Sequence, residues 1–300
     1  VCVTLDWITT AFVLTLVFIV FEMQAYTIPT GSMADTLMGA HFRLRCGQCG
    51  QDYNYGFIPQ QYGFGENVAP GFNVPVKQPG PMCPACGYTL PPQDPMPVTK
   101  GDRIFVNKCI YQFIEPKRWD VVVFNSPLQP HINYIKRLIA LPSETVEIID
   151  GDIYVDGQIE AKPINVQREL WMPVYNNEYL PVNPAAGQFI DGHMWKQPFI
   201  NAEGSGWQLN ADGAKKFVLD GSDDKINIIE YNAGVRDFKA FCSHNDSRML
   251  SSMPPCSDLM VRFYCSSESA EGKIGASLSK YATWYTATVD LAGGMVIEKT

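Results

Sequence analysis

The sequence predicts a mainly β protein with an N-terminal transmembrane helix, a loop-built zinc module and a second, β-sandwich-like domain. Three observations support this fold class. Short apolar runs separated by Gly-Asp, Ser-Pro and Asp-Gly turns recur from residue 100 onward, which is typical of antiparallel strands. An uncharged run of 15 residues lies near the N-terminus, and four cysteines form two C-x-x-C pairs.

Length and charge limit the classes of protein that fit. The chain has 300 residues, of which 46% are hydrophobic and 18% charged, enough for one large or two medium domains. A disordered chain is therefore excluded. The formal charge of −8 gives no attraction to phosphate backbones, so we expect no nucleic acid as a partner.

The N-terminal apolar run WITTAFVLTLVFIVF covers residues 7–21, between Asp6 and Glu22. A membrane span needs about 20 apolar residues, so a buried core helix or the end of a signal peptide is an alternative. The run lacks a polar stripe at the helical period, and it lies where a core helix would have no earlier partner in the chain. We therefore expect residues 1–22 to form a transmembrane anchor whose start is truncated.

Residues 39–97 have a different character, because ten of the 22 prolines lie between Pro59 and Pro97 and no apolar periodicity persists. This composition predicts a loop-built module. Its Cys46-Gly-Gln-Cys49 and Cys83-Pro-Ala-Cys86 pairs are separated by 33 residues. Two residues between thiolates let a tight turn aim both sulfurs at one ion, and two such turns complete a tetrahedral zinc shell. A redox C-x-x-C pair or two disulfides are the alternatives.

Zinc held by Cys46, Cys49, Cys83 and Cys86 would be structural. Four thiolates leave no open position for water, so we expect the zinc to stabilise the module, and we expect no cofactor for catalysis. Residues 38–100 carry four basic and three acidic side chains, a balance that does not suit a nucleic-acid finger.

Two β-rich regions follow the module. Residues 98–170 contain GDRIFVNKCIYQF, RWDVVVFNSP and INYIKRLIALPSETVEIIDGDIYVDG, which we interpret as several antiparallel strands. Residues 171–300 contain short alternating stretches such as KFVLDG and WYTATVDLAGGMVIEK, which favour a second, separate β-sandwich.

Histidine-based catalysis has no support in the sequence. No H-E-x-x-H motif and no G-x-S-x-G elbow occurs. The histidines are scattered, and each is interpreted as a surface or turn residue: His41, His131, His193 and His244.

A serine and a lysine remain as candidates. Ser32 lies in the segment IPTGSM directly after the apolar run, where a Gly-Ser pair by itself is only a turn. If YIKRLIAL is a strand, Lys136 shares a face with Tyr134, Leu138 and Ala140, and Arg137 lies on the other. A lysine in such a position usually extends outward to water.

Together these segments resemble signal peptidase I, the membrane-anchored serine proteases with a Ser/Lys dyad. The resemblance covers four blocks in order: the apolar run with IPTGSMADTL, then GDRIFVNK, PKRWDVVVF and NYIKRLIALPSETVEIIDGDIYVDG. In the family the first block has the form I-P-S-G-S-M-x-P-T-L and carries the nucleophile, which falls on Ser32. The Y-I-K-R block carries the lysine base, which falls on Lys136.

The resemblance implies a mechanism for these residues. A serine hydroxyl is a weak nucleophile and needs a base, and lysine serves only when neutral, which burial against apolar neighbours favours. The Ser32 N–H and the Thr30 hydroxyl are the donors expected for the oxyanion. Thr30 replaces the family's commoner serine, and its extra methyl restricts the rotamer.

The resemblance also implies a substrate and a location. The family cuts preproteins after small residues in an A-x-A pattern, on the outer side of the bacterial cytoplasmic membrane, so signal peptides and the lipid bilayer are the expected partners. Apolar residues beside the nucleophile would shape shallow pockets, and core or interface packing is the alternative for each. The matching positions are Tyr26, Ile28, Pro29, Met33, Leu37, Tyr134 and Ile135.

Two departures from the family pattern leave an alternative function open. Leu37 and Gly101 are separated by 63 residues where the family has only a few, so the zinc module is an insertion. The family's last block, with G-D-N and S-x-D-S-R, is not found, and Asp246-Ser247-Arg248 lacks the preceding glycine and the following strand. The resemblance implies that residues 23–38 and 98–170 form one catalytic core, which would then resume after residue 300. The alternative is a catalytically inactive binding protein with a zinc module and a β-sandwich on a signal-peptidase scaffold.

Overall fold

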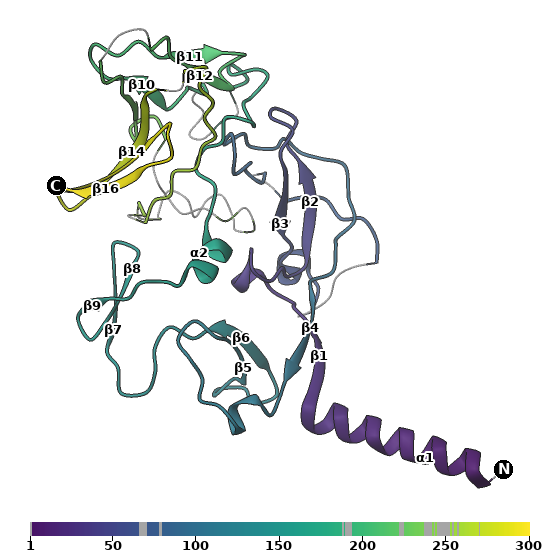
Figure 1. Ribbon diagram of the computed structural model, residues 1–300. Coiled ribbons are helices and arrows are strands. Elements are labelled where there is room, and N and C mark those ends of the chain that lie inside the picture. The colour runs from purple at the N-terminus through teal and green to yellow at the C-terminus, as the bar shows by residue number, and fades with distance from the viewer. Residues whose placement is uncertain are drawn as a thin grey trace.

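The computed structural model describes residues 2–65, 71–77, 80–187, 189, 194–221, 225–236, 242, 244, 253, 255–256, 258–269 and 271–300. Its regular structure is mainly β, which confirms the predicted class. The strands form small antiparallel sheets of two or three strands each. Figure 1 shows these sheets as separate groups along the chain, with the N-terminal helix projecting from the body.

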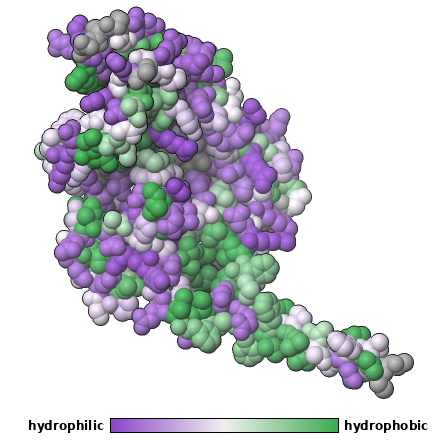
Figure 2. All heavy atoms as spheres, in the orientation of Figure 1, coloured by the Kyte–Doolittle hydropathy of each residue, from purple (hydrophilic) through white to green (hydrophobic). Residues whose placement is uncertain are grey.

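The N-terminal helix is apolar and exposed. Helix α1 (Cys2–Val17) continues into the π-helical turn η1 (Phe18–Glu22). Within them, the 20-residue stretch Val3–Glu22 is long and apolar enough to cross a membrane, and none of it is buried. In Figure 2 hydrophobic side chains cover most of its surface. A transmembrane helix or a signal sequence fits these observations, and a buried core helix does not.

Strand pairing brings distant motifs together around the end of this helix. Strand β1 (Met23–Thr27) pairs with β4 (Arg103–Asn107), and Tyr26 lies opposite Ile104. Strand β5 (Val121–Asn125) pairs with β6 (Asn133–Arg137), and Val122 lies opposite Lys136. A 3₁₀ turn, η4 (Ile110–Gln112), lies between β4 and β5.

A third sheet follows, formed by β7 (Val146–Ile149), β8 (Asp152–Val155) and β9 (Gln158–Ile159). Its two turns are Asp-Gly pairs with positive φ at both residues: 50° and 87° at 150–151, then 50° and 77° at 156–157. This geometry suits two-residue hairpins, whose twist then matches that of the strands. Helix α2 (Ile164–Leu170) comes next.

The cysteine-containing module, residues 39–97, holds most of the cluster of buried hydrophobic side chains found among the described residues. Strand β2 (His41–Arg45) pairs with β3 (Asp52–Gly56), and the turn η3 (Pro59–Tyr62) follows. Fifteen buried side chains form one cluster here. Fourteen of them lie within residues 40–90, and the last is Phe189 from the C-terminal region, residues 171–300. Tyr179, Ala186 and Trp195 also pack against this cluster.

The C-terminal region forms three small sheets. Two of them have two strands each: β10 (Phe199–Asn201) pairs with β13 (Ile229–Tyr231), and β11 (Gln208–Ala211) pairs with β12 (Lys216–Val218). The third contains β14 (Lys273–Lys280), β15 (Thr283–Asp290) and β16 (Met295–Lys299). The predicted β-sandwich is not confirmed by these pairings.

The last sheet contacts the β7–β8 turn. Lys280 forms an ion pair with the buried carboxylate of Asp152, and the Tyr281 hydroxyl donates to Asp150 at 3.2 Å. Lys162, just before α2, pairs with Asp258 at 2.9 Å. The C-terminal region therefore contacts both the module and the sheet that follows β6.

Candidate functional site

Ser32 occupies the middle of a single 3₁₀ turn, η2 (Gly31–Met33). Extended residues lie on both sides of it, Thr30 with φ −122° and Ala34 with φ −70°, and the Ala34 N–H donates to the Gly31 carbonyl at 3.0 Å. Met33 is buried and Ser32 is exposed. The turn thus holds its methionine in the interior and presents the serine hydroxyl to solvent.

Asp102 holds both ends of the segment that carries this turn. Its carbonyl accepts from the Ile28 N–H at 2.8 Å, its own N–H donates to the Met38 carbonyl at 2.8 Å, and its carboxylate accepts from the Met38 N–H at 2.7 Å. Gly101 approaches so closely that a Cβ atom there would lie 1.9 Å from the Ile28 carbonyl oxygen. The sequence indicated a turn and a family block at Gly101-Asp102, and this bracing role was not predicted from it.

Lys136 reaches the serine from β6. Its Nζ donates to Ser32 Oγ at 2.7 Å and to the Ile135 carbonyl at 2.9 Å, and it lies 5.7 Å from the ring centre of Tyr134. The structure therefore brings together two predicted residues that are 104 positions apart in the chain. Lys136 is exposed and Tyr134 is 42% exposed, so the apolar surround expected for the lysine is incomplete.

Arg137 points to the other side of β6, as the strand alternation predicts. Its guanidinium donates to the Trp119 carbonyl at 3.1 Å and to Glu169 Oε2, in α2, at 2.7 Å. A longer contact of 3.4 Å joins it to the Thr36 hydroxyl, on the segment that follows Ser32. The strand that carries Lys136 is therefore connected to α2 and to the segment that follows Ser32.

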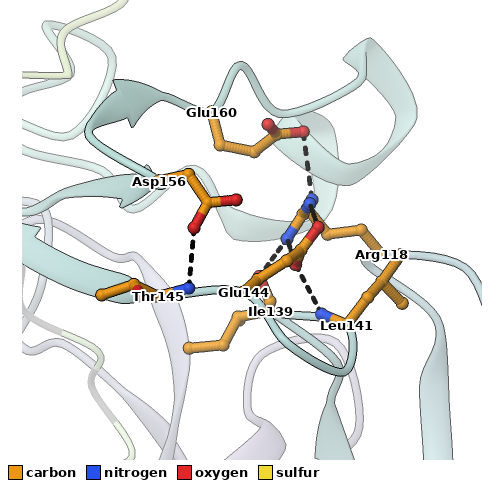
Figure 3. A network of polar contacts seen from close by, with 7 residues as sticks. All are labelled: Arg118, Ile139, Leu141, Glu144, Thr145, Asp156 and Glu160. Atoms are coloured by element: carbon orange, nitrogen blue, oxygen red, sulfur yellow. Dashed lines mark hydrogen bonds and ion pairs between the residues drawn. The ribbon is translucent and has the colours of Figure 1, made fainter.

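A polar network fixes the turn after β6 (Figure 3). Arg118 contacts Glu144 at 2.7 Å and Glu160 at 3.2 Å, and it also donates to the Ile139 carbonyl at 2.8 Å. Glu144 accepts from the Leu141 N–H at 2.6 Å. The Arg118 guanidinium, together with this N–H, lowers the pKa of the Glu144 carboxyl. The turn is thus braced by a largely buried ion pair, whose side chains are 14% and 20% exposed.

The remaining predicted pocket residues are divided between interior and surface. Ile28 and Met33 are buried, as expected for packing residues, while Tyr26, Pro29, Leu37 and Ile135 are partly buried. Thr30, the predicted oxyanion donor, precedes the Ser32 turn, and its side chain makes no capping hydrogen bond to that turn. The substrate-binding and oxyanion roles stay predictions.

The four predicted zinc ligands converge at one point. The sulfurs of Cys46, Cys49, Cys83 and Cys86 all lie within 4.8 Å of one another, and all four cysteines are free thiols. The Cys46–Cys86 and Cys49–Cys83 sulfurs are both 3.6 Å apart. A tetrahedral zinc with bonds of about 2.3 Å requires sulfurs ~3.8 Å apart, so the arrangement fits a zinc ion, and a disulfide would need about 2.05 Å.

The two cysteine turns have the same backbone geometry. In the first, the Cys46 N–H donates to the Gln51 carbonyl and the Gly50 N–H to the Cys46 carbonyl, each at 2.9 Å. In the second, Cys83 donates to Tyr88 and Gly87 to Cys83, each also at 2.9 Å. The glycine after each pair has a positive φ, 77° at Gly50 and 75° at Gly87, which favours glycine.

The thiols influence one another strongly. The hydrogen bond with Cys49 is the largest factor that lowers the pKa of Cys46, and the hydrogen bond with Cys46 raises the pKa of Cys86. Four adjacent thiols therefore do not ionise together by themselves. A divalent cation would hold all four as thiolates.

Comparison with known proteins gives matches to bacterial proteases. The family model described as "Signal peptidase, peptidase S26" matches residues 86–183. The signal peptidase I of Rickettsia rickettsii (strain Sheila Smith) is 30% identical over 241 residues, which are 79% of this chain and 75% of that protein. The chain belongs to the signal peptidase I family.

Other signal peptidases match shorter stretches. The signal peptidase I of Rickettsia akari (strain Hartford) is 30% identical over 162 residues, so the chain spans about half, 46%, of that relative's length. Signal peptidase I T of Bacillus subtilis (strain 168) is 43% identical over 63 residues, 21% of this chain and 32% of that protein. No solved structure matches the chain significantly.

The region matched by the signal peptidase family model includes Lys136 and not Ser32. The assignment of Ser32 therefore depends on the IPTGSM segment and on the contact with Lys136.

One histidine, His41 in strand β2, corrects the expectation that all four lie at the surface or in turns, whereas His244 lies in a turn, as expected, but is buried there. His41 and His244 are both buried, and their rings lie 6.1 Å apart. His131 is exposed in a turn, as expected, and His193 lies outside the described residues. Burial and the neighbouring His41 lower the pKa of His244.

His244 packs between the Ser32 turn and the cysteine module. A Cβ atom at Gly31 would lie 2.2 Å from His244 Nδ1, and one at Gly56, in β3, would lie 2.3 Å from it. Two residues earlier, the Cys242 thiol contacts Asp35 at 3.6 Å. The triplet Asp246-Ser247-Arg248, the nearby sequence signal, lies outside the described residues.

Proposed function

We propose that this protein is a membrane-anchored serine endopeptidase that removes N-terminal signal peptides from exported preproteins, with Ser32 as nucleophile and Lys136 as general base. One observation carries the proposal: in a chain of the signal peptidase I family, Lys136 Nζ and Ser32 Oγ are 2.7 Å apart. That distance is within the reach that proton transfer requires.

The chemistry follows from that contact. Neutral Lys136 accepts the hydroxyl proton while Ser32 Oγ bonds to the scissile carbonyl carbon. The lysine then gives the proton to the leaving amine as the peptide C–N bond breaks. Water repeats the sequence on the acyl-enzyme and releases the signal peptide. A bound peptide would exclude water from the exposed amine, and an amine without water favours its neutral form.

The oxyanion would be stabilised by donors on the serine turn. The first N–H groups of a helical turn have no partner inside the turn, which supports the Ser32 N–H as one donor. The Thr30 hydroxyl, which makes no capping bond, is the second. We propose that two groups of residues line the pocket for small side chains of the A-x-A type. They are Tyr134 and Ile135 on one side, and Tyr26, Ile28, Pro29, Met33 and Leu37 on the other.

The proposed location is the outer side of a bacterial cytoplasmic membrane, with α1 as the anchor. The apolar, exposed helix ends at Glu22, ten residues before Ser32, which supports a site close to the bilayer surface. Such a position suits a preprotein whose own apolar signal segment is still in the membrane.

We further propose that the four cysteines bind one structural zinc ion. The short distances between the four sulfurs and the matching turns support it, and a closed thiolate shell leaves the ion no catalytic position. Purified protein should contain about one zinc per chain. Cys86→Ser should lose the zinc, whereas Cys265→Ser, at an exposed free thiol, should retain it. Disulfides in place of metal would contradict this proposal.

The test of catalysis is cleavage of a preprotein by detergent-solubilised protein that contains residues 1–300. Ser32→Ala and Lys136→Ala should each abolish cleavage with an unchanged circular dichroism spectrum, and Lys136→Arg should not restore it, because a guanidinium stays protonated. Ser266→Ala and Lys273→Ala, at exposed positions elsewhere, should retain wild-type rates. Cleavage by either dyad variant would refute the proposal. Binding of preprotein without cleavage by the wild type would favour the inactive binding protein.

A further inference from the structure

The residues between the paired cysteines are contacted by distant parts of the C-terminal region. In the first pair, the Gln48 carbonyl accepts from the Val182 N–H at 2.9 Å, and its side-chain oxygen accepts from the Asn183 N–H at 3.0 Å. In the second pair, the carbonyls of Pro84 and Ala85 each accept from the Arg236 guanidinium at 2.8 Å. We call Gln48, Pro84 and Ala85 the knuckle face.

Apolar packing continues this contact. Phe189 is buried in the module's core, and its ring meets that of Tyr88 edge-on at 5.5 Å. Tyr88 is also the residue whose carbonyl closes the second cysteine turn. The C-terminal region is therefore attached to the module by hydrogen bonds at both turns and by an aromatic side chain beside one of them.

Charge favours the same attachment. Four thiolates around one Zn²⁺ carry a net negative charge, and the backbone carbonyls of the turn direct further negative potential outward. The Arg236 guanidinium is the cation bound at this point, and it is partly buried. A cation in a partly desolvated position is stabilised by such a neighbour more strongly than it would be in water.

We propose that the zinc site is the docking point for residues 182–236, so that metal occupancy controls whether this region is held on the module. The inference rests on the proposed structural zinc. The acceptors of the knuckle face belong to the two cysteine turns, which the ion would hold in place. Loss of the ion frees the turns, and the preorganised set of acceptors is lost with it.

Metal binding and docking are then coupled, and the coupling must be reciprocal. If zinc strengthens docking by a certain factor, a variant that abolishes docking should weaken zinc affinity by the same factor. We expect a factor of about 10, within the usual range of roughly 5- to 150-fold. The consequence extends toward Ser32, because Arg236 precedes Cys242 and His244, which contact Asp35 and pack on Gly31.

The experiment is hydrogen exchange with mass spectrometry on the whole chain in detergent, with zinc and after removal by a chelator. We expect faster exchange not only at residues 46–51 and 83–88 but also at 176–187 and 225–236. The β7–β8 hairpin, residues 146–155, should be unchanged. Faster exchange confined to the cysteine turns would overturn the proposal.

A substitution away from the ligands tests the reverse direction. Arg236→Gln should still bind about one zinc per chain, with about 10-fold lower affinity in a chelator competition and faster exchange at 225–236. Arg262→Gln is the matched control, because the bond described for that guanidinium is a 3.4 Å contact with the Tyr264 hydroxyl. Wild-type zinc affinity and exchange in Arg236→Gln would overturn the docking proposal alone. Absence of zinc from the wild type would overturn the metal site as well.

Discussion

The cysteine module and the region around Ser32 are stabilised in different ways. The module has a cluster of fifteen buried side chains, with Phe42 fully buried at its centre. Around Ser32 the geometry depends on hydrogen bonds to the Asp102 backbone and carboxylate and on the contacts of Arg137. Large apolar side chains there remain exposed, as at Phe105 in β4, which is 73% exposed.

This difference predicts which substitutions each region should tolerate. A packed core loses stability when volume is removed, because the cavity persists. A hydrogen-bonded site of few buried side chains loses little stability in that way, but its activity depends on backbone position, since a displacement of about 1 Å can cost roughly 100-fold in rate. The comparison therefore predicts stability effects in the module and activity effects around Ser32.

The largest expected effect is on the free energy of unfolding. Phe42→Ala should lower it by about 3–5 kcal/mol, because a fully buried aromatic side chain is removed. Phe105→Ala should leave it almost unchanged, since the side chain is mostly exposed. Urea unfolding of both variants in detergent measures this, and equal losses would remove the proposed contrast.

The second-largest expected effect is a loss of activity when the backbone near Ser32 is displaced. In Gly101→Ala the new Cβ would collide with the Ile28 carbonyl oxygen at 1.9 Å, and a backbone atom cannot turn aside. We expect kcat/KM for preprotein cleavage to fall about 100-fold. Gly47→Ala in the first cysteine turn is the control, because nothing lies within 4 Å of its Cβ position. Wild-type rates in Gly101→Ala would contradict the bracing role of the Gly101–Asp102 segment.

A smaller loss of activity is expected where a new Cβ atom would collide with a side chain and not with the backbone. Gly31→Ala would meet three atoms of the His244 ring, the nearest at 2.2 Å, so kcat/KM should fall about 10-fold. Adding His244→Ala should restore most of the lost rate. The same addition should not rescue Gly39→Ala, whose Cβ would meet the Thr30 backbone at 2.3 Å. A double variant no better than Gly31→Ala would show that His244 is not the obstruction.

The smallest effect concerns pH and the Arg118–Glu144 pair. Because the pKa of Glu144 is lowered in the folded protein, the pair stabilises above the ordinary carboxyl value of about 4.3 and stops doing so as the pH falls through the folded value. Wild type should therefore have a higher Tm than Glu144→Gln at pH 7, and the difference should vanish on acidification. Glu271→Gln, at an exposed position, should match wild type throughout.

Much of the local structure was predictable because it depends on few neighbouring residues. The C-x-x-C-G spacing specifies turns whose glycines need positive φ, and the Asp-Gly pairs at 150–151 and 156–157 specify tight hairpins. The apolar run predicted an exposed apolar helix. The amino-acid sequences of four blocks predicted the signal peptidase I family, which the comparisons confirm. The pairing of Ser32 with Lys136 was expected only through that resemblance.

The sequence by itself thus determined turns, strand alternation and the residues worth testing, since these follow from short-range sterics and side-chain chemistry. Only the tertiary structure decided which distant segments meet. It brings Lys136 to Ser32, joins Arg236 to the cysteine turns, buries His244 against Gly31 and adds Phe189 to the module's core. Such contacts depend on how segments far apart in the chain pack and pair with one another. The pattern of apolar and polar residues within one segment does not specify which other segment it will contact.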